Sequence, residues 1–302
     1  MPTPARPDAE TVISVGVRID LRATLSPLAH GAGDPTIRIG ADGIWRATRA
    51  PSGPVSIRLV SSGTEIRVTA WGPGADWAIG VAADLVGATD QPEALTPRHP
   101  LIAELIRRFP GLRLPRTHRP FDALLPAICE QKVTGTEARA AFRGIIRTYG
   151  EPAPGPARLR LAPDPSVLAR LPYFAYHRFG LERRRAELIR RCAALAPRLE
   201  GRSATEVGAI LRGVPGIGPW TMAEVTRVAF GDPDAVSVGD YHIPSVVAWA
   251  LARERRADDA RMLELLEPYR GQRGRVQRLL EVSGIFPPRH GPRMAPRTIA
   301  NE

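Results

Sequence analysis

The residues of this chain with the clearest capacity for chemistry lie between positions 211 and 244. The segment begins L-R-G-V-P-G-I-G-P-W-T-M-A, and the lone carboxylate of Asp240 follows in G-D-Y-H-I-P. A glycine-rich turn before a helix leaves backbone amides uncovered, and such a turn binds anions such as phosphate. An acid nearby can stabilise positive charge at a sugar carbon or orient a water molecule. This combination predicts chemistry on a nucleic acid.

Two helices must hold this turn in place. Ser203 and Glu206 form an S-x-x-E capping box, which predicts a helix over 203–213. Pro219 suits the first position of a second helix over 219–230, where its missing N–H would have no partner anyway. The glycine-rich residues between the helices are too few for anything but a tight hairpin.

Each half of the motif also has an ordinary structural explanation. P-G-I-G alone is typical of a turn between two core helices, and an aspartate before a helix is usually an N-cap. The two features together, at this spacing, favour a functional site. Capping and catalysis do not exclude each other.

The motif resembles that of the helix-hairpin-helix DNA glycosylase superfamily, and within it that of DNA-3-methyladenine glycosylase II. In that family, L-x-G-[IV]-P-G-I-G-x-W-T-A precedes a catalytic aspartate in a D-Y-x-I element. Here Trp220 occupies the tryptophan position, and Asp240 lies twenty residues further on. Two more blocks occur in the family order, P-G-L-R-L-P with F-D-A at 110–123 and G-L-E-R-R-R-A-E-L at 180–188. The resemblance spans about residues 109–284.

The resemblance implies a base-excision-repair enzyme that flips an alkylated purine out of duplex DNA. Asp240 would then assist hydrolysis of the N-glycosidic bond. Trp220 stands where family members with lyase activity carry a lysine, so the resemblance implies a monofunctional enzyme. It implies no organic cofactor, but a monovalent cation held by the backbone of Gly213, Pro215 and Gly218.

An alkylated base often carries positive charge, which an electron-rich aromatic pocket would accommodate. The candidate pocket residues are Trp220, Tyr241, Tyr173, Phe174, Tyr176 and His177. The last four belong to one short segment, for which a hydrophobic plug beneath a loop is the alternative. The ring of Tyr241 would contact either the base or the core.

The predicted DNA contacts come from three segments. The first is the hairpin, with Gly213, Val214, Pro215, Gly216, Ile217 and Gly218. The second holds Gln131 and Lys132, at the position where the family inserts a wedge into the duplex. Family members often have leucine there, so Lys132 would either insert its aliphatic stem or bind a phosphate. The third is the basic run 269–276, with Arg270 and Arg273, which would be a backbone clamp or a solvated face.

Composition agrees with a polyanionic partner. The formal net charge is +11 and the pI is about 10.9, which favours salt-sensitive binding. Lys132 is the only lysine, so the arginine enrichment is equally explained by genome composition. Cys129 and Cys192 are too few for a four-cysteine iron–sulfur site, and we expect them to be buried and reduced. No signal peptide and no apolar run of about 18 residues is present, so we expect a cytoplasmic, nucleoid-associated protein without membrane contact. The family resemblance implies a monomer.

The pattern predicts an α+β fold, with a small N-terminal antiparallel β-sheet domain followed by an all-helical helix-hairpin-helix glycosylase core. The expected boundaries are 1–95 for the first and 96–286 for the second, whose two helical subdomains enclose the active-site cleft. A disordered basic tail is expected at 287–302. Alternation at Ile13, Val15, Val17 and Ile19 predicts a strand, and similar runs occur near 55–59 and 66–68. The predicted helices are 75–86, 97–109, 120–131, 134–149, 164–171, 181–199, 203–213, 219–230, 241–253, 258–269 and 272–283.

Two other functions fit the same residues. The first is a glycosylase for a different lesion, such as a deaminated purine. The second is a helix-hairpin-helix protein that binds DNA without catalysis. Asp240 favours an enzyme, because a protein that only binds DNA needs no acid at that position.

Overall fold

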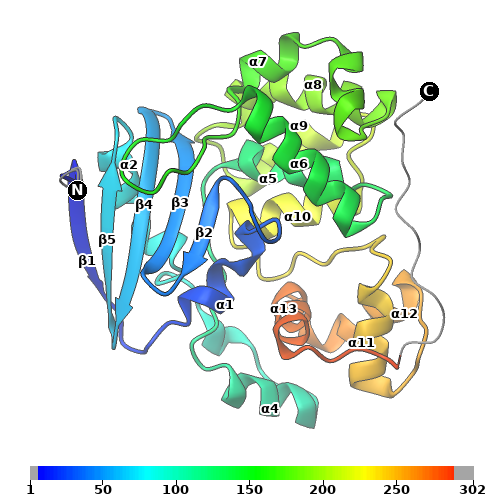
Figure 1. Cartoon of the computed structure of the whole chain (residues 1–302). Helices are drawn as coiled ribbons and strands as arrows, with labels where there is room; N and C mark the ends of the chain where they lie inside the picture. Colours follow the sequence, from blue (N-terminus) through cyan, green and yellow to red (C-terminus); the bar gives the residue numbers. More distant parts are fainter. Residues whose placement is uncertain (1–5, 289–302) are drawn as a thin grey trace.

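An antiparallel sheet near the N-terminus is followed by a succession of helices (Figure 1). The computed structural model describes residues 6–288, and the sheet order is β1-β5-β4-β3-β2. This arrangement confirms the predicted α+β class. The strands are β1 (Ala9–Ser14), β2 (Ile37–Gly40), β3 (Gly43–Ala50), β4 (Gly53–Ser62) and β5 (Glu65–Trp71).

The two faces of the sheet are covered by different parts of the chain. In β5, Ile66, Val68 and Ala70 alternate inward and form one core with the short helices α2 (Ala75–Gly80) and α3 (Ala82–Leu85). On the other face, the rings of Trp45 and Trp71 stack with 5.3 Å between their centroids. The proline-rich connection over residues 152–163, between α6 (Gly135–Tyr149) and α7 (Pro165–Arg170), covers both rings with Ala157, Leu159 and Leu161.

The first predicted strand is partly wrong. β1 ends at Ser14, and Val17 is 52% exposed. The reason is that β1 loses its partner, since β5 begins at Glu65, directly opposite Ser14. The chain then turns into α1 (Leu21–Leu25), which Asp20 caps by accepting a hydrogen bond from the Ala23 N–H.

The helices follow the predicted ranges closely. They are α4 (Pro100–Arg108), α5 (Pro120–Glu130), α6 (Gly135–Tyr149), α7 (Pro165–Arg170), α8 (Arg183–Leu199), α9 (Ala204–Arg212), α10 (Pro219–Ala229), α11 (Ile243–Ala252), α12 (Asp259–Leu266) and α13 (Arg273–Ser283). The capping boxes of Thr134 with Glu137 and of Ser203 with Glu206 are both confirmed. The predicted helix over 75–86 is broken at Val81 into α2 and α3.

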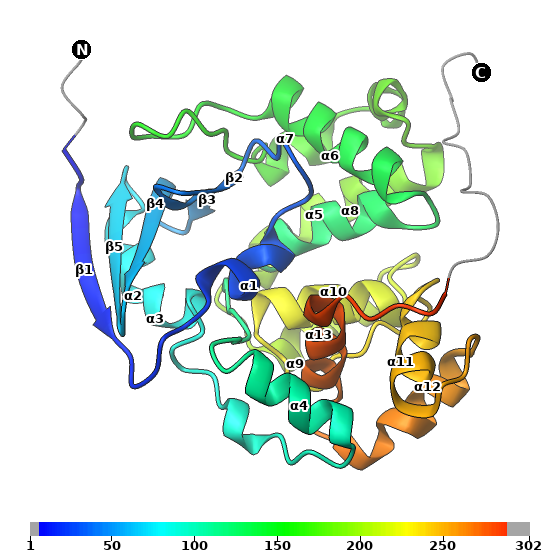
Figure 2. The ribbon, with the colours of Figure 1, turned by 60° about the horizontal axis from the view of Figure 1, so that its bottom comes forward.

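The helices enclose two further cores. One joins α5, α6 and α8–α10, and the other joins α4 with α11–α13. Helix α10 lies between the two groups (Figures 1 and 2). Leu95, at the predicted boundary between the sheet and the helices, already packs in the second helical core. Most of the predicted basic tail, from 289 onward, lies outside the described residues.

The two cysteines lie inside the helical part of the fold. Cys129 and Cys192 are buried and unpaired, as expected, and burial raises the pKa of each thiol to about 12. Across residues 6–288, no helix combines the length and the apolar character that crossing a bilayer demands. The same part of the chain holds no cluster of three or more His, Cys, Asp or Glu side chains suited to a metal ion.

Candidate active site and nucleic-acid interface

The hairpin joins α9 to α10 and presents backbone to solvent. Val214 is buried and Ile217 packs against the same helical core, so the side chains of these two predicted DNA contacts face the protein interior. Gly216 has φ +104°, a conformation that residues with a Cβ rarely adopt. The remaining turn residues, Gly213, Pro215 and Gly218, are exposed together with it. The fold thus leaves the start of α10 open to an anionic ligand.

A side chain from a distant segment holds the hairpin in place. The side-chain amide nitrogen of Gln131, Nε2, donates to the carbonyl oxygen of Gly216 at 3.1 Å and to Thr221 Oγ1 at 2.9 Å. The next residue, Lys132, is exposed and has φ +55°. The structure therefore fixes the only lysine of the chain beside the hairpin, with its ammonium group in solvent.

Asp240 stands in the turn that leads into α11. Its Oδ1 atom accepts hydrogen bonds from the backbone N–H groups of His242 at 2.7 Å and Ile243 at 2.9 Å. Its own N–H donates to the Ser237 carbonyl at 3.1 Å. These bonds fix the carboxylate at the helix start while leaving the side chain half-buried.

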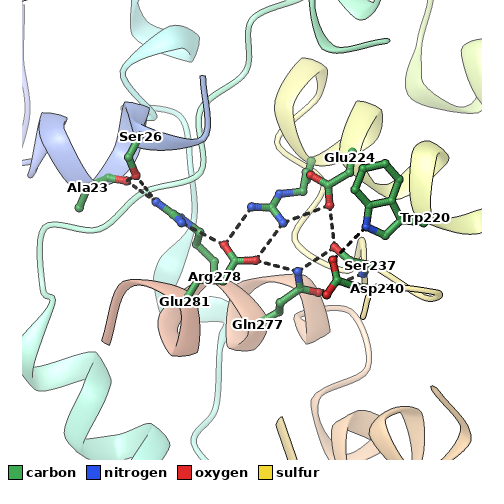
Figure 3. Close-up of polar contacts among 10 residues, drawn as sticks. Ala23, Ser26, Trp220, Glu224, Ser237, Asp240, Gln277, Arg278 and Glu281 are labelled. Carbon is green, nitrogen blue, oxygen red and sulfur yellow. Dashed lines mark hydrogen bonds and ion pairs between the residues drawn. The ribbon is translucent and has the colours of Figure 1, made fainter. Parts of the chain in front are cut away.

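A direct hydrogen bond joins the hairpin helix to this carboxylate. The Nε1–H group of Trp220 donates to Asp240 Oδ2 at 3.2 Å (Figure 3). Trp220 and Asp240 were both predicted site residues, and the structure brings them together. Each carboxylate oxygen is therefore oriented by donors, and the group stays available to a substrate from the solvent side.

A buried polar network lies directly behind Asp240, and sequence reasoning missed it (Figure 3). Glu224, one helical turn after Trp220, accepts a hydrogen bond from Ser237 Oγ at 2.7 Å. The Gln277 side chain accepts from the Ser237 N–H at 3.0 Å and donates to Ser237 Oγ at 2.8 Å. The only local sequence signal was that Glu224 lies four residues after Trp220, on the same face of α10.

Charged groups extend the network through α13. Arg227 donates to both carboxylate oxygens of Glu281 at 3.0 and 2.9 Å. Burial alone would raise the pKa of Glu281, but Arg227 and Arg278 outweigh burial and lower it to about 2. Arg278 also donates to the Ala23 carbonyl at 2.7 Å, so the network reaches helix α1, which follows the first strand.

The predicted aromatic pocket is corrected by the structure. Tyr176 is fully buried, and its hydroxyl group donates to the Leu168 carbonyl at 2.7 Å, so the prediction that it contacts a base is wrong. A sequence stretch rich in aromatic residues does not reveal which ring faces the core.

The other rings of that segment lie between α7 and α8. The ring of Tyr173 packs against Phe174, against His177 and beneath the Arg183 guanidinium. The structure does not bring this group to Asp240, because the α7–α8 connection lies at the far end of the helical unit from α11 (Figures 1 and 2). Tyr241 does flank Asp240; it is 89% exposed, with its ring edge-to-face against His242.

The basic run before α13 is engaged within the protein. Arg273 holds Asp234 through two donors, and Arg270 holds Glu267 through two bonds of 2.8 Å. The sequence could not show these partners. Both guanidinium groups already have carboxylate partners, so we rank Lys132 above them as a DNA contact; the contacts of Arg270 and Arg273 with DNA stay predictions.

The chain was compared with protein-family models, with curated proteins and with solved structures, and only solved structures are similar to it. No protein-family model matches the chain, and no curated protein matches its sequence. The solved structure of 3-methyladenine DNA glycosylase from Archaeoglobus fulgidus is similar, with a TM-score of 0.74 at 18% identity over 90% of this chain and 98% of that one.

Two structures containing DNA are also similar. The 8-oxoguanine glycosylase/lyase of Clostridium acetobutylicum, in complex with duplex DNA, gives a TM-score of 0.68 at 14% identity, covering 92% of this chain and 96% of that one. The 3-methyladenine DNA glycosylase Mag1 of Schizosaccharomyces pombe, in complex with abasic DNA, gives 0.51 at 16% identity, covering 63% and 95%. From its N-terminal sheet to α13, this chain therefore has the fold of the helix-hairpin-helix DNA glycosylases.

Proposed function

We propose that this protein is a monofunctional DNA glycosylase of base-excision repair that removes alkylated purines of the 3-methyladenine type. The observation that carries the proposal is the Trp220–Asp240 hydrogen bond, which couples a candidate catalytic carboxylate to an exposed hairpin. The similar structures named above are glycosylases, two of them with DNA bound. The partner we propose is duplex DNA with a damaged base, bound by a monomer.

The chemistry follows from where the carboxylate is held. The C1′–N bond of the flipped nucleotide breaks, its electron pair leaves with the base, and positive charge develops on the sugar. Asp240 stabilises that charge and orients a water molecule; the water oxygen then bonds to C1′ as one of its protons passes to the Asp240 carboxylate. The backbone donors at His242 and Ile243 keep the carboxylate in place during these steps.

Trp220 supports the proposed absence of lyase activity. An indole cannot form the imine through which a lysine cleaves the backbone. Lys132, the only lysine, lies beside Gln131, which binds the hairpin rather than Asp240. We propose that Lys132 contacts the DNA backbone or wedges into the duplex, and takes no part in the chemistry.

The hairpin backbone fits the cation that the fold family implies. Gly213 and Pro215 are exposed, and within the described chain their carbonyl oxygens accept no backbone hydrogen bond. Those oxygens, with that of Gly218, would hold a monovalent cation, which would supply charge for binding a DNA phosphate. No organic cofactor is proposed.

The test uses duplex DNA treated with a methylating agent. We expect the protein to release methylated purines, with strand breaks appearing only after hot alkali. Breaks without alkali, or a covalent adduct trapped by borohydride, would contradict a monofunctional enzyme. Release of hypoxanthine alone would indicate a deaminated-base glycosylase, and binding without any release would indicate a non-catalytic DNA-binding protein.

A further inference from the structure

Glu224 is a carboxylate that the proposed mechanism does not use. Its side chain is 21% exposed, and its Oε1 atom accepts from Ser237 Oγ at 2.7 Å and faces Arg227 at 3.4 Å. Among the described residues, its Oε2 atom has no hydrogen-bond partner. Because Glu224 Oε2 is not among the fully buried polar atoms that lack a partner, it is open to solvent, and a ligand can reach it there.

Glu224 also lines a cavity beside the candidate site. The cavity is enclosed by the loop before β2, by β3, and by α5 and α10, and its volume is about 60 Å³. That space takes one edge of a purine, so a flipped base would enter edge first. Ser237 bonds both Glu224, which lines the cavity, and the Asp240 backbone, so one residue connects the cavity lining with the proposed catalytic carboxylate.

The carboxylates of this cavity are unequally neutralised. Asp122 is paired with Arg46 at 3.0 Å and with the Thr48 hydroxyl. Glu130 lies beside His30, with 3.6 Å between the closest ring nitrogen and carboxylate oxygen, and its charge also acts on Arg227.

Glu224 is poorly neutralised for a different reason. It shares Arg227 with Glu281, and Glu281 takes the two shorter bonds. The cavity wall formed by Glu130 and Glu224 is therefore negative in excess.

The titration of Glu224 agrees with this geometry. Burial raises the pKa of Glu224, and the negative charges of Glu281 and Glu130 raise it further, against the opposing effects of Arg227 and Ser237. A positive charge placed in the cavity would offset the negative charges of Glu281 and Glu130 and favour the ionised form of Glu224.

We propose that Glu224, together with Glu130, recognises the positive charge of a purine alkylated on a ring nitrogen. This inference rests on the proposed function and names the feature of the substrate that is read. Normal and deaminated purines are neutral and lack this attraction. The segment from Tyr173 to His177 does not reach the site, so carboxylates supply the selectivity for a cation beside Trp220 and Tyr241.

The charge on the base disappears as the C1′–N bond breaks, because the bonding electron pair stays with the base. Glu224 therefore stabilises the bound lesion rather than the product. Its replacement should weaken binding of the cationic lesion, and raise KM for it, more than it lowers kcat. A purely structural role for Glu224 would lower affinity for all DNA alike.

The experiment measures binding without excision. One duplex carries 7-methylguanine on a 2′-fluorinated sugar, which keeps the cationic nucleotide intact. The other carries 7-methyl-7-deazaguanine, a neutral base of the same shape. Affinities are measured for the wild-type protein, for Glu224→Gln, and for Glu264→Gln as a control on α12, whose side chain is 69% exposed.

Wild type and the control should prefer the cationic duplex by about tenfold, which is about 1.4 kcal/mol, and Glu224→Gln should lose that preference. Glu130→Gln, on a side chain 37% exposed, should reduce it and serves if Glu224→Gln fails to fold. Equal affinity of wild type for both duplexes, or an unchanged preference in both cavity variants, would overturn the inference. The proposed function fails separately: a charge preference without release of any base would refute excision but leave the recognition intact.

Discussion

At the scale of single residues, Asp240 is held by two elements at once. Its Oδ1 atom accepts from the backbone N–H groups of His242, the N-cap of α11, and of Ile243, while Oδ2 accepts from Trp220 on the hairpin helix. These bonds hold the carboxylate in the orientation that the proposed chemistry requires. As the sequence indicated, a structural role at the start of a helix does not exclude catalysis.

The Trp220 hydrogen bond is testable by replacing the indole with a ring of similar shape. Trp220→Phe removes the donor to Asp240 and should lower kcat for excision about tenfold with KM little changed, because a hydrogen bond to a charged group is lost. Single-turnover release of the base measures this. The control, Trp249→Phe on α11, should behave as wild type; equal kcat for both variants would show that the bond does not orient Asp240.

Lys132 tests the proposed DNA contact at the loop before α6. Lys132→Ala should reduce the slope of log K against log salt by about one, because one phosphate contact is lost. Fluorescence anisotropy with undamaged duplex at several salt concentrations measures the slope. Arg270→Ala, whose guanidinium already holds Glu267, should leave it unchanged. A smaller slope for Arg270→Ala, with an unchanged slope for Lys132→Ala, would show that the basic run before α13 contacts DNA and that Lys132 does not.

At the scale of elements, the hairpin depends on one backbone conformation. Gly216→Ala should destabilise the fold by about 1–3 kcal/mol, since φ is +104° and the new Cβ would lie 3.2 Å from Leu188. Gly218→Ala is the control, with φ −102° and no atom near the new Cβ, and should change stability little. Urea unfolding measures the free energy of unfolding of both variants. Equal values for the two would show that the hairpin tolerates a Cβ at position 216.

Elements defined by local signals were predictable from the sequence, and those defined by distant partners were not. The capping boxes, Pro219 at the start of α10 and Gly216 act within a few residues, and each was placed correctly. The end of β1 depends on where β5 begins, which no local pattern records.

The same distinction applies within the site. Asp240 and Trp220 were predicted from one motif, whereas the pairing of Glu224 with Ser237 requires α10 to pack against the loop before α11. Burial of Tyr176 likewise depends on the helices around it, so an aromatic-rich segment alone was misleading.

At the scale of the whole molecule, one buried polar network joins three helices around the site, namely α1, α10 and α13. Glu281 bonds Arg227 of the hairpin helix, and Arg278 bonds the carbonyl of Ala23 in α1 (Figure 3). The charge of Glu281 therefore helps to hold α10, α13 and α1 in their relative positions.

This dependence predicts how stability responds to acid. The pKa of Glu281 is lowered from 4.5 to about 2 in the folded protein, so its stabilising effect is complete above the unfolded value. As pH falls from about 4.5 to about 2, the unfolded state binds the proton first and at most about 3 kcal/mol is lost. Urea unfolding at about pH 3 and pH 6 measures the change.

Glu281→Gln is the comparison for that measurement. It should be less stable than wild type near neutral pH, because Arg227 loses a buried partner, and its stability should fall less between the two pH values. An equal fall in both proteins would assign the acid sensitivity to other carboxylates.

The central claim is that Asp240 performs excision on DNA held by the hairpin. The most direct measurement compares wild type with Asp240→Asn on the same methylated duplex, recording released bases and DNA affinity for each. We predict at least about a 100-fold loss of release in the variant, with affinity near that of wild type, because the amide keeps the shape but not the charge. Release at the wild-type rate would contradict the claim, and so would the absence of release by either protein.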